Sequence, residues 1–326
     1  MGILIYEHFL GHQYNKEISP MILNEAKIIT SSIAKDLSSS SKKQDVSVLI
    51  NAKNSSFLKN TKLINRNYSK NLTEDIYSNL NKNDNVLVIA PEENLEMHNI
   101  VAKLEEKNVD LYNCNSNFIK ITTNKKKIYS YLTKSKNYLI ETFDDYKSIQ
   151  DNKEIIAKTF DGFGSEELYI FKNIEHLKNS KYLLTNRHIY QPYYKGNIIG
   201  INIIANDNNH KILSINEQIY LEKSNNTIAL QAINIGKFNA LHKLFDEFVN
   251  NILSNFEGFH GFFGIDAIMT NDKKILFLEI NPRLTTSYSG LSYSLGFNPL
   301  ELFYNINYDF SIEDNKNFLI DITNDK

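Results

Sequence analysis

The hexapeptide NVLVIA, residues 85–90, is apolar at every position after its first. A strand of this kind is buried on both faces, as in a parallel sheet that helices cover on both sides. Apolar strands are also predicted at Gly2–Tyr6 and Val46–Ile50, and Ser19-Pro20 predicts the start of a helix that runs to about Leu37. Strands that alternate with helices predict an α/β fold with a parallel sheet in the first 115 residues.

The polar segments that follow two of these strands are expected at the rim of a binding crevice. Ligands of parallel sheets bind outside the carboxyl ends of the strands. This rule places Glu7–Tyr14 and Pro91–Asn94 beside any ligand that the sheet holds.

The bulk properties of the 326-residue chain exclude several classes of protein. The single cysteine, Cys114, rules out an internal disulfide and a multi-cysteine zinc site. The formal net charge of −2 provides no basic field for nucleic acid. No signal peptide and no membrane-spanning apolar run is predicted. We therefore expect a cytoplasmic protein without nucleic-acid or membrane partners, with a homodimer as the candidate assembly.

Two strands near the C-terminal end are predicted to form a hairpin closed by the loop Asn271–Lys274. In that register Asp266 lies opposite Glu279 and Gly264 lies opposite Asn281. The same register predicts the pairs Ile265–Ile280, Ala267–Leu278 and Met269–Leu276 on an apolar face, and the pair Ile268–Phe277 on the other face.

The facing carboxylates of Asp266 and Glu279 predict a metal site. Like charges directly opposite each other on a sheet repel, and a cation between them removes the repulsion. Asn281 shares the face of Glu279, about 7 Å away, because side chains alternate along a strand. Carboxylate and amide oxygens suit Mg²⁺ or Mn²⁺. Solvated acids on an exposed hairpin are the alternative.

Lys158 and the glycine loop after it predict a flap that binds phosphate. Lys158 lies in the apolar strand IIAKTF, and the loop DGFGSEE leads into a second strand, ELYIF. Gly162 and Gly164 allow backbone N–H groups to approach phosphate oxygens closely. The loop is no Walker motif, because a strand follows it instead of a helix. An ordinary hairpin turn and a lysine that extends to the surface are the alternatives.

The order of these features resembles the ATP-grasp superfamily. The resemblance covers most of residues 120–290, through Lys158, the glycine flap, the connection YQPYYKG and the motifs IDAIM and LEINPRLTTSY. The last motif is similar to that of archaeal-type amino-acid ligases, especially the tyramine–L-glutamate ligases of methanofuran biosynthesis. The openings ILIYEH and VLVIAPEEN also resemble that family.

The resemblance implies an ATP-grasp fold of the α/β (α+β) class. Residues 1–118 would form an N-terminal βαβ domain with a parallel sheet, and residues 119–195 a small central lid domain that binds ATP. Residues 196–326 would form the catalytic domain with an antiparallel sheet.

The resemblance also implies roles for single residues. Lys158 and Lys125 would contact the ATP phosphates, with Lys126 or Lys127 as substitutes for Lys125 and a plain basic helix terminus as the alternative. Arg283 would act with Lys158 as a catalytic residue by stabilising the transferred phosphoryl group. The metal ligands would be Asp266, Glu279 and Asn281, and the hinge that holds adenine would be Gln191, Pro192, Tyr193 and Tyr194, which is otherwise an aromatic-rich connection.

Three features depart from the family pattern. Many relatives have a ribose-binding glutamate where this chain has Ile198, and some have an arginine where it has Gly264. The flap also has fewer glycines than usual. We therefore expect Arg283 to supply the charge that Gly264 lacks.

The implied activity is amide formation. A substrate carboxylate attacks the γ-phosphate of ATP, and an amine then attacks the acyl phosphate. The expected partners are small molecules, an amino acid carboxylate and an amine, with glutamate and tyramine as candidates. Glu7, Glu92 or Glu93 would pair the amine, although acids at strand ends are usually solvated or lie at helix N-termini. The alternatives are a ligase for another amino acid, a peptide or a carrier protein, and a non-catalytic nucleotide-binding regulatory protein.

Overall fold

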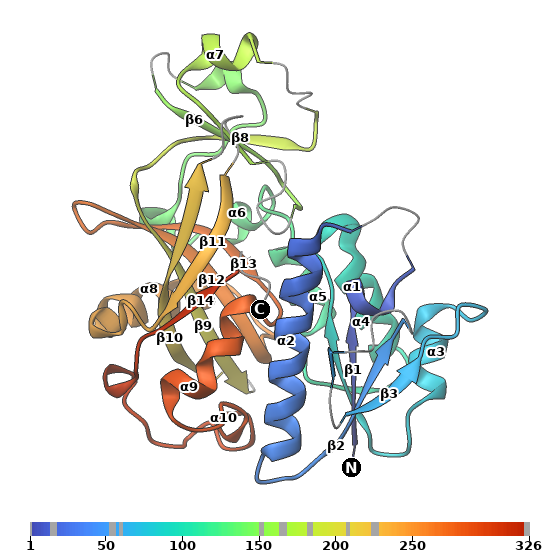
Figure 1. Ribbon diagram of the computed structural model, residues 1–326. Coiled ribbons are helices and arrows are strands. Elements are labelled where there is room, and N and C mark those ends of the chain that lie inside the picture. The colour runs from blue at the N-terminus through green and yellow to red at the C-terminus, as the bar shows by residue number, and fades with distance from the viewer. Residues whose placement is uncertain are drawn as a thin grey trace.

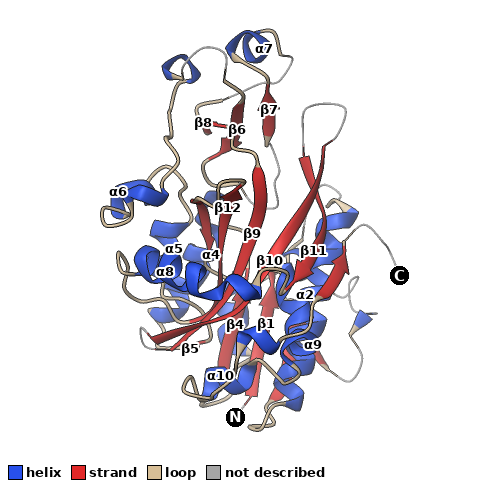
Figure 2. Cartoon of the chain, turned by 90° about the vertical axis from the view of Figure 1, so that its left-hand side faces the viewer, coloured by secondary structure: helices blue, strands red, loops and turns tan. Residues whose placement is uncertain are grey.

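The computed structural model describes residues 2–13, 18–51, 57–58, 61–149, 153–162, 168–180, 185–206, 209–222 and 228–322. Within this part of the chain the strands form three sheets (Figure 1, Figure 2). The first sheet is parallel and the other two are antiparallel. The predicted α/β class, with a parallel sheet first and antiparallel sheets after it, is confirmed.

The parallel sheet has the strand order β3-β2-β1-β4-β5. Side chains of β1 alternate between two hydrophobic clusters, with Ile3 and Ile5 in the cluster of α2 and Leu4 and Tyr6 in the cluster of α4. Helices therefore cover both faces, which explains the uninterrupted apolar strands. The elements are β1 (Gly2–Glu7), α1 (His8–Gly11), α2 (Pro20–Ser39), β2 (Asp45–Ile50), β3 (Lys62–Asn65), α3 (Leu72–Ser78), β4 (Asn85–Ile89), α4 (Glu96–Glu105), β5 (Asp110–Leu111) and α5 (Ser116–Thr122).

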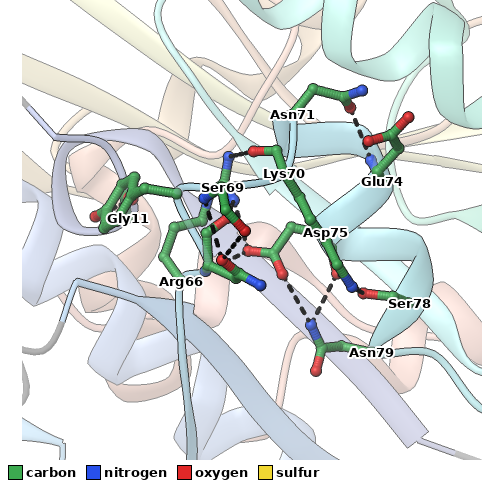
Figure 3. A network of polar contacts seen from close by, with 11 residues as sticks. Gly11, Arg66, Ser69, Lys70, Asn71, Glu74, Asp75, Ser78 and Asn79 are labelled. Carbon is green, nitrogen blue, oxygen red and sulfur yellow. Dashed lines mark hydrogen bonds and ion pairs between the residues drawn. The ribbon is translucent and has the colours of Figure 1, made fainter.

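A buried ion pair fixes the edge of this sheet, where β3 and α3 were not predicted (Figure 3). The Arg66 guanidinium lies 2.6 Å from the Asp75 carboxylate, and both side chains are buried. The backbone N–H of Asn67 also donates to Asp75, at 2.8 Å. These contacts satisfy the buried carboxylate and hold the β3–α3 connection against the helix.

The small sheet, at the top of Figure 1, has the order β7-β6-β8. The two predicted strands are confirmed as a pair, because Ala157 in β6 pairs with Tyr169 in β7, whereas residues 163–167 of the glycine loop lie outside the described residues. A turn precedes α6, in which the Asn124 side chain accepts from the backbone N–H groups of Lys126 and Lys127. The elements are α6 (Ile128–Tyr131), β6 (Ile155–Thr159), β7 (Tyr169–Phe171), α7 (Ile174–Lys178) and β8 (His188–Pro192).

The large antiparallel sheet has the order β13-β12-β9-β10-β11-β14. Its hairpin strands β12 and β13 were predicted, whereas β11 and β14 were not. The elements are β9 (Gly196–Asn206), β10 (Asn209–Glu222), β11 (Ile228–Ile235), α8 (His242–Leu253), β12 (Gly261–Thr270), β13 (Ile275–Asn281), α9 (Leu291–Leu295), α10 (Leu300–Tyr304) and β14 (Phe318–Asp321).

The parallel and large sheets share their hydrophobic core. One cluster joins Val88 and Phe118 to Ile201 and Phe277, so residues from both ends of the chain pack together. The small sheet has a cluster of its own, which includes Ile155 and Phe171. The domain boundaries 1–118, 119–195 and 196–326 stay a prediction.

Candidate functional site

Two adjoining cavities lie where the small sheet meets the large one. The larger, called here the lid cavity, has a volume of about 490 Å³ and mostly apolar walls, including Ile140, Ile198 and Leu278. The smaller, called the carboxylate cavity, has a volume of about 80 Å³ and is lined by Lys125, Lys158, Asp266 and Glu279 among others. Several residues line both, including Lys158 and Leu278. One elongated site therefore has an apolar end and a charged end.

The hairpin brings the predicted metal ligands together. Asp266 lies opposite Glu279, and Gly264 lies opposite Asn281, as the sequence predicted. The Asn281 amide nitrogen donates to Asp266 Oδ2 at 3.0 Å. Two carboxylates and an amide are thus gathered on one face of β12 and β13.

The predicted register is wrong nearer the turn, because β13 has a β-bulge at Leu278. Beyond the bulge Ala267 pairs with Phe277 instead of Leu278. The extra residue places Leu278 and Glu279 on the same face, where both line the carboxylate cavity. Phe277 instead packs fully buried in the shared core. The corrected pairs beyond the bulge are Ala267–Phe277, Ile268–Leu276 and Met269–Ile275.

Two lysines from different elements face the carboxylates. Lys125 Nζ lies 2.9 Å from Glu279 Oε2 and donates to the Gly162 carbonyl at 2.6 Å. Lys158, on β6, is 8 % exposed and lines both cavities. Burial lowers the pKa of Lys158 to about 8, an effect that Glu279 opposes and Lys125 reinforces. The charged end therefore presents cations and anions side by side, as a metal–phosphate group requires.

The two carboxylates differ in charge because their neighbours differ. Burial raises the pKa of Asp266 to about 7, and the adjacent Glu279 charge adds to the increase. Burial also acts to raise the pKa of Glu279, but Lys125, Lys158 and Arg283 outweigh it, so that pKa lies below its usual value. A divalent cation between the two groups would remove the cost of ionising Asp266. The donor set of Asp266, Glu279 and Asn281 fits Mg²⁺ or Mn²⁺.

Gln218 holds Asp266 in position, and the sequence analysis did not identify it. Its side chain crosses β9 at Gly200 and donates to Asp266 Oδ1 at 3.0 Å, while its own oxygen accepts from Tyr220 at 3.0 Å. Gln218 and Tyr220 alternate along β10 and both line the two cavities. The available signal was the polar alternation of Ser214, Asn216, Gln218 and Tyr220 along β10.

We expect Gly200→Ala to lower the affinity for a divalent cation about tenfold without unfolding the protein. A Cβ at this position would lie 2.7 Å from the Gln218 amide nitrogen, so the Gln218 side chain must leave Asp266. Loss of such a supporting contact typically lowers metal affinity 10- to 100-fold, by an order-of-magnitude rule. Calorimetric titrations of the protein with Mg²⁺ or Mn²⁺ measure the effect. Gln218→Ala should shift the midpoint similarly, and unchanged midpoints in both variants would contradict the role of Gln218.

The side chain of Arg283, two residues after Asn281, binds an acid that follows β4 of the parallel sheet. Its Nε and Nη2 donate to the Glu92 carboxylate at 2.9 and 3.2 Å, and Nη1 donates to the Leu284 carbonyl at 3.2 Å. Burial acts to lower the pKa of Arg283, but Glu92, Glu25 and Glu7 outweigh it and raise that pKa. The bidentate pair fixes the guanidinium plane. The Glu92 partner, 191 residues away, had no sequence signal.

The predicted hinge lines the lid cavity. Gln191, Pro192, Tyr193 and Tyr194 all contribute to its wall. The Gln191 amide donates to Tyr129 and Thr142, at 2.9 and 2.7 Å, so its side chain braces the scaffold. The hinge therefore lines the cavity mainly with the apolar and aromatic side chains of Pro192, Tyr193 and Tyr194.

The remaining predicted residues divide into three groups. Lys125 is brought to the carboxylates, whereas Lys126 pairs with Asp144 at the surface, at 2.8 Å. Gly162 lines the carboxylate cavity. Gly164 lies outside the described residues.

Glu7, at the end of β1, is a buried carboxylate whose pKa is far from its usual value. Its side chain accepts from the Leu10 N–H at 2.8 Å. Burial raises its pKa from 4.5 to about 8, and the Leu10 and Phe9 N–H groups and Arg283 only partly offset this. Ionised Glu7 therefore destabilises the ligand-free fold.

We expect Glu7→Gln to raise the melting temperature by an increment that grows with pH. Between pH 4.5 and about 8 the folded protein retains a proton that the unfolded chain has lost, so wild-type stability falls as the pH rises. Glutamine does not titrate. Thermal melts without ligand from about pH 5 to 8 measure the increment. Glu106→Gln, at the exposed end of α4, is the control, and a constant increment for Glu7→Gln would contradict the assignment.

The chain belongs to the ATP-grasp family. Residues 122–287 match the family model described as an ATP-grasp domain. A crystal structure from Archaeoglobus fulgidus, described as an ATP-grasp superfamily protein, superposes with a TM-score of 0.73 at 18% identity, covering 98% of this chain and 99% of that one. The predicted ATP-grasp fold is thus confirmed.

Two curated proteins similar to this chain are tyramine–L-glutamate ligases. The protein from Methanocaldococcus jannaschii is 29% identical over 228 residues, which is 68% of this chain. The protein from Methanocaldococcus fervens is 29% identical over 220 residues, which is 67% of this chain. The matched region spans 64% of the length of each relative.

The described part of the chain contains no helix with the length and apolar character that crossing a bilayer requires.

Proposed function

We propose that this protein is an ATP-dependent ligase that joins a carboxylate to an amine, with L-glutamate and tyramine as the first candidate pair. The observation that carries the proposal is the carboxylate cavity, where facing Asp266 and Glu279 lie beside Lys125 and Lys158. The adjoining apolar cavity has the volume of a small-molecule site. The two named relatives support the substrate pair.

In this proposal adenine occupies the lid cavity against Leu278 and the hinge, and the phosphates extend toward Lys125 and Lys158. A divalent cation, Mg²⁺ or Mn²⁺, would neutralise phosphate charge and orient the transferred phosphoryl group. Asp266, Glu279 and Asn281 would hold the cation, and Gln218 would orient Asp266. The flap that begins at Gly162 would exclude water from the acyl phosphate.

Lys125 would exchange partners when phosphate binds. In the ligand-free protein it pairs with Glu279. Phosphate oxygens offer it an anionic partner of higher charge, which leaves the Glu279 carboxylate to the cation. Lys158, desolvated and with a lowered pKa, would regain its full charge beside the phosphates.

The test is an ADP-release screen that crosses L-glutamate and other amino acids with amines, tyramine included. We expect ADP release that needs a carboxylate, an amine and Mg²⁺ or Mn²⁺ together, with the amide identified by mass spectrometry. ADP release by another pair would change the substrate assignment. No amine-dependent release across the panel would instead support a nucleotide-binding regulatory protein. Homodimerisation and a cytoplasmic location stay predictions.

A further inference from the structure

A third cavity lies where the connections of the parallel sheet diverge. In the order β3-β2-β1-β4-β5 the chain leaves β1 toward β2 on one side, whereas β4 lies on the other. Parallel sheets bind ligands at this switch point, outside the carboxyl ends of the strands. A cavity of about 60 Å³ lies there and is called the switch-point cavity. Its lining includes Glu7, Phe9, Ile22, Glu25, Pro91 and Arg283.

The structure decides which acids at this edge are available to a ligand. Of the three acids predicted to pair an amine, Glu92 pairs with Arg283 and Glu93 lies 2.9 Å from Arg187. Glu7 lines the cavity and is only 2 % exposed. Glu25, on α2, lines it as well and was not predicted. In the part of the chain that the structure describes, neither Glu7 nor Glu25 makes an ion pair.

Hydrogen bonds orient these two carboxylates without neutralising them. Glu7 accepts from the Leu10 N–H at 2.8 Å, and Glu25 accepts from the Thr286 hydroxyl at 2.5 Å. Burial raises the pKa of both groups, and the charge of Arg283 only partly offsets it. A carboxyl in this situation gains most from a ligand that brings its own positive charge.

The other lining residues restrict which chemical class of ligand the cavity can bind. Arg283 is the one cation among the described lining residues, and its Nε and Nη2 already bind Glu92. The described residues therefore offer no free cation for a second carboxylate, which disfavours a zwitterionic amino acid. Phe9, Ile22 and Ile29 supply an apolar wall. These features favour an amine that has an apolar body and no acid group.

The cavity also lies beside the carboxylate cavity. Arg283 lines the switch-point cavity, and its backbone N–H donates to the carbonyl of Asn281, a predicted metal ligand, at 2.8 Å. Arg283 thus lies between the two sites. A group bound at the switch point lies next to the place where the proposed acyl phosphate forms.

We propose that the switch-point cavity binds the primary ammonium group of the acceptor amine between Glu7 and Glu25, with the apolar body of the amine against Phe9 and Ile22. This inference rests on the proposed ligase function and deepens it. Glu7 and Glu25 are specificity-determining residues for a cationic acceptor. The carboxylate substrate and ATP bind on the other side of Arg283.

The experiment compares a charged acceptor with an uncharged one. Tyramine carries an ammonium group at neutral pH, whereas hydroxylamine is neutral and traps acyl phosphates as hydroxamates. Steady-state rates with L-glutamate, ATP and Mg²⁺ are measured against each acceptor for wild type, Glu25→Gln, Glu7→Gln and the exposed control Glu106→Gln. Melting temperatures confirm folding, and Glu25 is the safer site because it is only half-buried.

We expect Glu25→Gln and Glu7→Gln to raise KM for tyramine at least about tenfold, the loss typical of a charge-assisted contact. The KM for ATP and the hydroxamate rate should change less than about threefold, and Glu106→Gln should match wild type. An unchanged KM for tyramine in both variants would overturn the inference, as would a rise in KM for L-glutamate instead. Wild-type hydroxamate formation without amide from tyramine, ethylamine or ethanolamine would also overturn it. Absence of hydroxamate in the wild type with L-glutamate and with every other amino acid of the ADP-release screen would refute the ligase proposal itself.

Discussion

The Glu279→Gln variant is expected to lose ADP release about a thousandfold or more. The substitution removes one of the two facing carboxylates, so that Asp266 alone would supply negative charge to a divalent cation. It also removes the anionic partner of Lys125, which lies 2.9 Å away. Preorganised charges at a phosphoryl-transfer site contribute several orders of magnitude to the rate. Stopped-time assays of ADP measure the loss.

Folding is the control for this variant. Lys125 is only 8 % exposed. In the variant its buried ammonium group would face the neutral amide of Gln instead of a carboxylate, which destabilises the fold. We therefore expect a lower melting temperature together with a native circular dichroism spectrum. Glu141→Gln, an exposed change near the lid cavity, should match wild type in both assays. Turnover by Glu279→Gln within threefold of wild type would exclude Glu279 as a metal ligand.

The Lys158→Met variant should lower kcat/KM for ATP about a hundredfold to a thousandfold while leaving the fold as stable as before, or more so. Methionine keeps the unbranched shape and most of the length of the side chain, and removes a charge whose desolvation already lowers the pKa of Lys158 to about 8. Replacing a costly buried charge with an apolar group is often neutral or stabilising. Activity and stability should therefore change independently.

Lys126→Met is the matched comparison, because Lys126 was the substitute candidate for phosphate contact and the structure pairs it with Asp144 at the surface. We expect its ATP kinetics to resemble wild type. Rates with varied ATP, together with thermal melts, are the measurements. The lysine assignment would be reversed if Lys126→Met lost activity and Lys158→Met retained it.

Local sequence patterns predicted the elements that their own side chains dictate. The apolar strands β1 and β4 had to be covered on both faces, and Pro20 begins α2 as expected. The opposition of Asp266 and Glu279 followed from strand alternation over a few residues. The edge strands β3 and β14 escaped prediction because each is short and its strand conformation depends on pairing with a neighbour.

Local periodicity was enough to predict the parallel sheet, the paired strands β6 and β7 and the facing carboxylates, because each depends on one or two adjacent elements. The bulge at Leu278 depends instead on tertiary packing, because it lets Phe277 enter the core while Glu279 lines the cavity. Tertiary packing also decided that Arg283 binds Glu92 and that Gln218 reaches Asp266 across Gly200. These partners lie far apart in the chain, and which of them meet depends on how whole sheets pack, a choice that local spacing does not encode.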